Sequence, residues 1–303
     1  MIDGIPLVDA HVHAARLPTV KPSLEEWTGH FRGGVAHLLE LYDNEGTLVP
    51  ESFDGYMAGE GVDIAILFSE YSPKSTGIQP AEDLAPILSY NPERFRLMAN
   101  LNPHLHYPLV EELERQMGFG AVGLKIHPVH GGFPPNERML YPAYALCEWE
   151  GFPVVFHCGT SVFPGVTNRY ADPALIEDVA RDFPGLTIVL AHGGRGWWYD
   201  AAAFITLMRE NAYIEISGLP PKKLPDYYAK YDFERLARKM IFGTDWPGVP
   251  GNRANALALF DLGLERETLE KILYKNALLV YDLKRGESEN DVFGKDMQPT
   301  DTL

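Results

Sequence analysis

Short apolar segments recur along the whole chain, and each one ends in polar residues, glycine or proline. They are rich in Val, Ile and Phe, which is typical of buried strands. Amphipathic stretches with helical periodicity separate most of them. The predicted strands are 7–13, 62–70, 95–103, 121–128, 153–160, 187–194, 212–218 and 239–247. The clearest predicted helices are 109–117, 173–183, 201–211 and 267–283.

Regular alternation of strand and helix indicates parallel strands joined by crossover helices. Eight such units in about 250 residues are typical of a (β/α)8 TIM barrel. A doubly wound open sheet is the alternative, but no glycine-rich phosphate loop follows the first strand. We therefore expect one α/β barrel domain over residues 1–283.

Two segments depart from the even spacing. Residues 14–60, between the first two strands, are too long for a simple helical crossover. Because this insertion leaves the C-terminal end of the first strand, we expect it to cover the active-site mouth. Residues 284–303 are polar and aperiodic, and we expect them to form a C-terminal extension outside the barrel.

Composition narrows the class of partner. Of the 303 residues, 46% are apolar and 22% are charged, as in an ordinary globular protein. The formal net charge of −16 disfavours nucleic acid or an anionic membrane surface as a partner. Two cysteines form no disulfide framework and suit the reducing cytoplasm. Since no apolar run of about 18 residues occurs, we expect a cytoplasmic protein that acts on a small molecule.

Polar residues gather at the C-terminal ends of several predicted strands, which is the end where barrel enzymes carry their chemistry. Side chains alternate along a strand, so Asp9, His11 and His13 are predicted to share the inward face of the first strand. The other inward residues are Lys125 and His127 on the fourth strand, His157 on the fifth, His192 on the sixth and Asp245 on the eighth.

Histidines and an aspartate at one rim suit a divalent transition metal. Neutral imidazoles bind Zn, Mn, Fe or Ni, and a carboxylate completes a site that leaves one position for water. His11 and His13, two residues apart on a strand, can reach the same ion. An isolated His-x-His pair is a weak signal, but its combination with the other rim residues is specific. The alternative is a polar barrel mouth whose residues are satisfied by hydrogen bonds alone.

The motifs DAHVH, GLKIHP, FHCGTS, LAHGG and IFGTDWP occur in this order and resemble those of the amidohydrolase superfamily of metal-dependent barrels. The chain is most similar to the "amidohydrolase 2" branch, which includes hydrolases and decarboxylases, and the resemblance covers residues 3–283. It implies one metal, usually zinc, and suggests a homo-oligomer. The implied metal ligands are His11, His13, His157 and Asp245. The expected catalytic acid/base residues are His192 and, through its second oxygen, Asp245.

Lys125 lies within an otherwise apolar strand, where an ammonium group needs a partner. In binuclear members of the superfamily a lysine on the fourth strand is carbamylated and bridges two metals, so a second metal is one alternative. A purely structural ion pair is another. We favour an unmodified ammonium group that pairs with Glu215 or binds a substrate carboxylate.

The resemblance implies that a metal-activated water cleaves an amide, lactone or ester. In related carboxylate lyases the histidine on the fifth strand is commonly followed by proline, whereas CGTS follows it here, which favours hydrolysis. Nonoxidative decarboxylation is the second hypothesis, and a catalytically silent barrel that binds a ligand or a metal is the third. Predicted substrate-binding or supporting residues are Lys125, His127, Arg169, Arg195, Glu215 and Trp246, which suit a small carboxylated cyclic or aromatic substrate.

Overall fold

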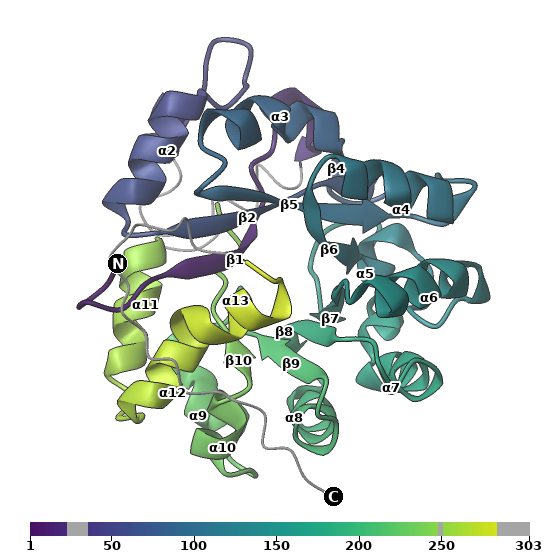
Figure 1. The fold of residues 1–303 in the computed structure, drawn as a ribbon, viewed down its shortest axis with the longest axis vertical. Coiled ribbons are helices and arrows are strands. Elements are labelled where there is room, and N and C mark those ends of the chain that lie inside the picture. Colours follow the sequence, from purple (N-terminus) through teal and green to yellow (C-terminus); the bar gives the residue numbers. More distant parts are fainter. Residues whose placement is uncertain (23–35, 248–250, 284–303) are drawn as a thin grey trace, which may run out of the picture.

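A sheet of eight parallel strands forms the centre of the molecule (Figure 1). The computed structural model describes residues 1–22, 36–247 and 251–283. Neighbouring strands follow the order β1-β2-β5-β6-β7-β8-β9-β10. The strands are β1 (Val8–Val12), β2 (Ile64–Phe68), β5 (Phe95–Leu101), β6 (Ala121–Ile126), β7 (Val154–Gly159), β8 (Ile188–Arg195), β9 (Ala212–Glu215) and β10 (Met240–Ile241).

Backbone hydrogen bonds join the two end strands and close the barrel. The Ala10 N–H donates to the Phe242 carbonyl over 3.0 Å, and the His13 N–H donates to the Trp246 carbonyl over 3.0 Å. Both acceptors lie beyond β10, in the segment predicted as the rest of the eighth strand. The predicted TIM barrel is therefore confirmed, with a shorter last strand than expected.

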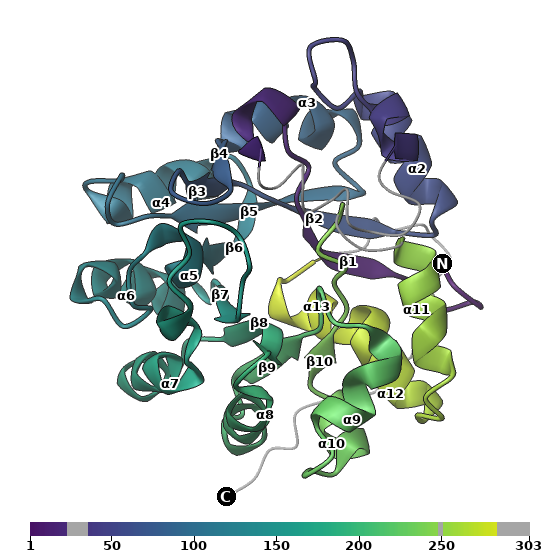
Figure 2. The ribbon, with the colours of Figure 1, turned by 180° about the vertical axis from the view of Figure 1, so that it is seen from behind.

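Helices surround the sheet in both views (Figures 1 and 2). The predicted helix over 267–283 is a run of three pieces, with a π-helical turn at Lys271–Lys275 between α12 (Arg266–Glu270) and α13 (Asn276–Val280). In Figure 1, α13 lies in front of the strands. Its Ala277 and Val280 belong to the apolar cluster inside the barrel, so this end is plugged by the C-terminal helix. The α-helices are α2 (Pro50–Gly59), α3 (Ala81–Tyr90), α4 (Leu109–Gly118), α5 (Pro128–Gly131), α6 (Tyr141–Glu150), α7 (Pro173–Asp182), α8 (Tyr199–Met208), α9 (Leu224–Tyr227), α10 (Phe233–Ala237), α11 (Asn252–Phe260), α12 (Arg266–Glu270) and α13 (Asn276–Val280).

The long segment between β1 and β2 contains α2 and two short 3-10 helices. Its C-terminal part is α2, a member of the outer helical ring (Figure 1). Two 3-10 helices, Leu17–Thr19 and Ala36–Leu41, precede it. The predicted extension over 284–303 lies outside the described residues. No helix in the described ranges is long and apolar enough to cross a membrane.

A β-bulge in β1 corrects the expected orientation of Asp9. Asp9 pairs with Ala65 and Val12 pairs with Leu67, so β1 holds one residue more than β2 over this stretch. Asp9 therefore points away from the barrel axis and accepts hydrogen bonds from the Thr244 N–H and hydroxyl, over 3.0 and 2.6 Å. The bulge leaves His11 and His13 facing inward.

A two-stranded hairpin, β3 (Glu70–Ser72) and β4 (Gly77–Gln79), follows β2 and was not predicted. It packs against the segment after β1, because a side chain on Gly77 would lie 2.3 Å from the Thr19 carbonyl. Gly77 has a φ of +124°, which glycine adopts readily. The hairpin lies at the C-terminal end of the barrel (Figure 2) and carries Glu70 to the mouth.

Candidate active site

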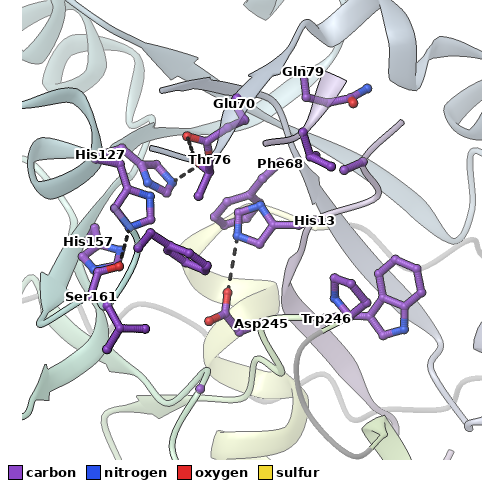
Figure 3. Close-up of a pocket in the computed structure, with 18 of the residues that line it drawn as sticks. His13, Phe68, Glu70, Thr76, Gln79, His127, His157, Ser161, Asp245 and Trp246 are labelled. Carbon is purple, nitrogen blue, oxygen red and sulfur yellow. Dashed lines mark hydrogen bonds and ion pairs between the residues drawn. The ribbon is translucent and has the colours of Figure 1, made fainter. Parts of the chain in front are cut away.

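One cavity of about 480 Å³ opens at the C-terminal ends of the strands (Figure 3). It is lined by residues of the segment after β1, of the hairpin, of β2, β7 and β8 near their C-terminal ends, and of the loops after β6, β7, β9 and β10. The apolar part of its wall includes Leu17, Val20, Leu38, Tyr42, Phe68, Phe163 and Trp246. The polar side chains in its wall include His13, Glu70, His127, His130, His157, His192, Arg195 and Asp245.

Three of the predicted metal ligands, His11, His13 and Asp245, converge at this cavity, and we call them the His–Asp group. The two Nε2 atoms lie 3.2 Å apart. Asp245 Oδ1 lies 3.5 Å from His11 Nε2 and 3.4 Å from His13 Nε2 (Figure 3 shows the second contact). Two imidazole nitrogens and one carboxylate oxygen this close together fit a tetrahedral or five-coordinate divalent ion that retains an open position.

Glu215 fixes the orientation of the His11 ring. His11 Nδ1 donates to Glu215 Oε2, and the Ser217 N–H donates to Glu215 Oε1 over 2.6 Å. Burial lowers the pKa of His11 to about 4, with a further contribution from the charge of Lys125. His11 is therefore neutral at pH 7 with its proton on Nδ1, which leaves the Nε2 lone pair for a metal. This carboxylate–histidine pair is the usual support of a metal-binding histidine.

Asp245 is held as a carboxylate in a strained backbone conformation. Burial raises its pKa, but the hydrogen bond from His13 and the nearby His192 and His11 outweigh that effect, so the pKa lies well below its ordinary value. Its φ is +63°, in the left-handed region that costs energy for a residue other than glycine. Such strain is concentrated at functional sites.

His192 lies beside the His–Asp group, and one ligand atom of each of His11, His192 and Asp245 lies within 4.8 Å of the other two, so His192 is itself within reach of an ion bound there. Its Nδ1 lies 3.0 Å from the Ser217 carbonyl and 2.9 Å from the Ser217 hydroxyl. A carbonyl oxygen can only accept, so Nδ1 carries the proton and Nε2 is the basic nitrogen. Burial and the charge of Arg195 hold the pKa of His192 well below its ordinary value, so the ring is neutral. His192 also has a positive φ, +67°.

The predicted ligand His157 lies in a second group with His127 and His130, which we call the three-histidine cluster. One ligand nitrogen of each lies within 4.8 Å of those of the other two. His157 Nε2 lies 3.1 Å from the Gly159 carbonyl, and His130 Nε2 lies 3.1 Å from the Ser161 hydroxyl. Burial lowers the pKa of all three rings, that of His130 to about 3, so all three are neutral.

The two groups adjoin each other in the wall of the cavity. The His13 and His127 ring centroids are 6.2 Å apart. His192 lies between the groups, with its ring centroid 4.4 Å from that of His157 and 5.1 Å from that of His11. The assignment of His157 as the fourth ligand of the His–Asp group remains a prediction.

Lys125 is fully buried beneath the cavity floor. Its Nζ lies 5.0 Å from the centre of the Phe68 ring and has no hydrogen-bond partner among the described residues. Burial lowers its pKa to about 8, against the opposing charges of Glu215, Asp245 and Glu70. No carboxylate oxygen in the described ranges lies within 4 Å of Lys125 Nζ, so the lysine forms no direct ion pair there. Its positive charge acts on the cavity floor from a distance.

The two predicted substrate-binding arginines lie in different surroundings. Arg195 lines the cavity, donates to the Thr160 carbonyl from Nε and Nη2 over 3.2 and 3.1 Å, and has Nη1 3.9 Å from Asp245 Oδ2. Arg169 is exposed, lies over the Tyr170 ring and donates to its hydroxyl over 3.0 Å. Only the first of these two cations reaches the cavity.

Sequence reasoning missed two polar residues of the mouth, His130 and Glu70. His130 follows His127 by three residues on one short helical turn, a spacing that places both rings on the same side. Glu70 lies two residues beyond the end of β2, as the first residue of β3, and its Oε2 lies 3.4 Å from His127 Nε2. A polar residue at a strand end and a His-x-x-His spacing were the available signals.

The Amidohydrolase family model, Amidohydro_2, matches residues 8–283. The chain belongs to this family. Members of the Amidohydro_2 family are metal-dependent enzymes that include hydrolases and decarboxylases. This agrees with the expected resemblance and with the convergence of ligand side chains at the barrel mouth. No curated protein matches the chain significantly.

Solved structures of similar fold cover nearly the whole chain. An uncharacterised TIM-barrel protein from Bordetella bronchiseptica is 23% identical, with a TM-score of 0.75 over 92% of this chain and 99% of that one. The 5-carboxyvanillate decarboxylase from Sphingomonas paucimobilis is 16% identical, with a TM-score of 0.64 over 93% and 100% of the two chains. A probable 2-pyrone-4,6-dicarboxylic acid hydrolase from Acinetobacter baumannii is 15% identical, with a TM-score of 0.60 over 92% and 100%. These likenesses show a shared fold.

Proposed function

We propose that the protein is a metal-dependent hydrolase that cleaves an amide, lactone or ester of a small carboxylated substrate with a cyclic or aromatic part. The observation that carries this proposal is the neutral His192, which has a ligand atom within 4.8 Å of those of His11 and Asp245. Its Nδ1 is bonded to Ser217, and its Nε2 has no hydrogen-bond partner among the described residues. When bound, a divalent ion supplies Lewis acidity, which lowers the pKa of water and polarises a carbonyl group. Hydrolysis needs both this acidity and a base within reach.

His192 is the proposed general base and acid. Its Nε2 takes the proton of the attacking water and returns it to the departing amine or alcohol. Ser217 holds Nδ1 protonated through its carbonyl, so the ring presents the same nitrogen to the substrate in every turnover. The ionised Asp245 stabilises the positive charge that His192 gains after it takes the proton.

Arg195 is the proposed partner of the substrate carboxylate. Its guanidinium lines the cavity and is held by the Thr160 carbonyl. The apolar part of the substrate would then lie against Phe68 and Trp246 in the same cavity. Lys125, beneath Phe68, would make the electrostatic potential at the cavity floor more positive without contacting the substrate.

Further features of the proposal rest on single observations. Leu17, Leu38 and Tyr42 line the cavity, which supports a role of the 14–60 segment as its cover. Zinc is the proposed ion because imidazole nitrogens dominate the donor set. Both cysteines are buried and free, which supports the cytoplasm as the compartment. A homo-oligomer is proposed from the family resemblance alone.

Nonoxidative decarboxylation is the second candidate reaction, since a solved structure of the same fold is a 5-carboxyvanillate decarboxylase. To test both, purified protein would be loaded with Zn²⁺ and screened against lactones, amides, esters and hydroxybenzoates. We expect hydrolysis that is lost after chelation and restored by Zn²⁺. Release of carbon dioxide from a carboxylated substrate would replace hydrolysis with decarboxylation, and absence of turnover with every metal and substrate would favour a silent binding barrel.

A further inference from the structure

We propose that His127 and His130 form a subsite for an uncharged polar group of the substrate, of which a hydroxyl group is the best fit. This inference rests on the proposed function, because it adds a second recognition element to the cavity in which Arg195 is proposed to bind the carboxylate. His127 follows β6 and His130 lies on α5, and both side chains line the cavity. Their exposed fractions are 3% and 5%, so the two rings are built into the cavity wall.

Three of the four nitrogens in these two rings have no hydrogen-bond partner among the described residues. They are both nitrogens of His127 and Nδ1 of His130. The remaining one, His130 Nε2, lies 3.1 Å from the Ser161 hydroxyl. A buried polar atom without a partner destabilises a protein, and buried polar atoms are nearly always hydrogen-bonded. Because both rings line a cavity, a polar group of a bound molecule is the partner that they can take.

The charges around the subsite favour a neutral group over an anion. Burial lowers the pKa of His130 to about 3 and the pKa of His127 well below its ordinary value, and the charge of Lys125 adds to both effects. Glu70 Oε2 lies 3.4 Å from His127 Nε2 (Figure 3). Two neutral rings beside an acidic side chain offer no cationic donor to a carboxylate, unlike Arg195. A hydroxyl group both donates and accepts, so it can bond to these rings whichever nitrogen carries the proton.

Hydrogen bonds fix the two chain segments around His130. The Thr167 N–H donates to the Val129 carbonyl over 2.9 Å, which ties α5 to the loop after β7. In that loop the Ser161 N–H donates to Asn168 Oδ1 over 2.8 Å, and the Asn168 side-chain amide donates to the Ser161 carbonyl over 3.0 Å. The subsite is therefore formed before a ligand binds, so little ordering cost opposes binding.

The subsite adjoins the residues predicted to bind the metal. The ring centroid of His127 lies 6.2 Å from that of His13 and 5.7 Å from that of His157. In the sheet, β7 lies between β6 and β8, so the subsite and Arg195 flank His157. Two recognition elements placed in this way select a substrate by the spacing of its hydroxyl and carboxylate groups. His157 itself stays available for its predicted role as a metal ligand.

The test on the wild-type protein compares ligands that carry no amide, lactone or ester bond. Calorimetric titration of Zn²⁺-loaded protein would measure the affinities for phenylacetate and for its three monohydroxylated derivatives. We expect one hydroxylated ligand to bind about 2- to 10-fold more tightly than phenylacetate, as a neutral hydrogen bond predicts. A crystal structure with that ligand should place its hydroxyl group within hydrogen-bond distance of His127 or His130. A hydroxyl group bound elsewhere, or a metal ion held by these two histidines, would overturn the inference.

Variants assign the preference to the two rings. His130→Phe and His127→Phe each keep a ring in place and remove its hydrogen-bonding nitrogens. Each should bind phenylacetate as the wild type does, while the preference for the hydroxylated ligand falls to about one. His104→Phe, at an exposed histidine, is the control and should keep the preference. A full preference in both cavity variants, with folding verified by circular dichroism, would contradict the inference.

These measurements separate the subsite from the proposed reaction. A preference for the hydroxylated ligand supports the subsite even where the screen for hydrolysis finds no turnover. Equal affinities for all of the ligands would refute the subsite and leave hydrolysis intact. Absence of binding by every ligand would overturn both the proposed class of substrate and the subsite.

Discussion

His11 Nε2 and His13 Nε2 lie 3.2 Å apart at the floor of the cavity. Since the His11 proton is on Nδ1, where Glu215 accepts it, the Nε2 lone pair points at its neighbour. The lone pair can accept a proton from His13 Nε2, and a cation that takes the place of this proton can bind both nitrogens. Glu215 prepares His11 for either partner, because it holds the His11 proton on Nδ1.

The first prediction concerns Glu215→Gln. The amide keeps the size of the side chain but loses the charge that fixes the His11 proton, so affinity for Zn²⁺ should fall by about 10- to 100-fold. Competition with a chromogenic chelator measures this. Glu177→Gln, which removes a surface partner of Arg209, is the control and should bind as the wild type. Equal affinity for Zn²⁺ in both variants would refute the role of Glu215.

The second prediction concerns His192→Asn. Asparagine tolerates the positive φ at this position better than most residues, so the backbone should be retained. Loss of the base should lower kcat for a hydrolysed substrate by about 10²- to 10⁴-fold. Steady-state kinetics and metal analysis should show reduced turnover with unchanged metal content. Normal turnover would assign the proton transfer to another group.

The third prediction separates the two arginines. Arg195→Gln removes a charge-assisted contact worth about 1.5–3 kcal/mol, so KM for a carboxylated substrate should rise roughly tenfold or more. A neutral analogue of the same substrate should show a much smaller change. Arg169→Gln is the matched control, because Arg169 is exposed on Tyr170. A larger effect at Arg169 than at Arg195 would reverse the proposed orientation of the substrate.

The fourth prediction uses His106, which packs edge-on against the Tyr71 ring and belongs to neither the His–Asp group nor the lining of the cavity. Its Nδ1 accepts the Asn102 N–H over 3.2 Å, and burial lowers its pKa below the ordinary value of about 6.5. The unfolded chain therefore takes up the proton first as the pH falls, so this residue's contribution to stability is present at pH 7 and decreases below about pH 6.5.

Urea unfolding at pH 7.0 and pH 5.5 measures this effect. The loss of unfolding free energy between the two pH values should be smaller in His106→Asn than in the wild type. His104→Asn, at an exposed neighbouring histidine, is the control and should lose as much as the wild type. An equal loss in the wild type and in His106→Asn would show that protonation of His106 does not affect folding.

The sequence predicted the barrel because buried strands leave a strong pattern. Each parallel strand is covered on both faces, so runs such as 153–156 are wholly apolar. The rim residues were found for the opposite reason, since His157 and Asp245 interrupt that pattern at strand ends. The apolar runs and the polar residues that interrupt them can both be recognised within a few consecutive residues, because burial of the strand determines which positions are apolar.

The features that were not predicted depend on contacts between distant residues. One extra residue in β1 turns Asp9 toward Thr244, and this depends on pairing with β2 and on the closing segment after β10. The β3–β4 hairpin is too short to show a period of two. The grouping of His130 with His157 arises only when α5 packs beside β7.

Barrel closure has a consequence for how the protein matures in the cell. Asp9 and Thr244 lie 235 residues apart in sequence, and their hydrogen bond joins the first strand to the last. His13 and Asp245 meet across the same seam. During synthesis, the N-terminal histidines leave the ribosome long before their aspartate partner. The metal of the His–Asp group should therefore bind only after nearly the whole chain has been synthesised. A chain truncated before Asp245 should lack this metal.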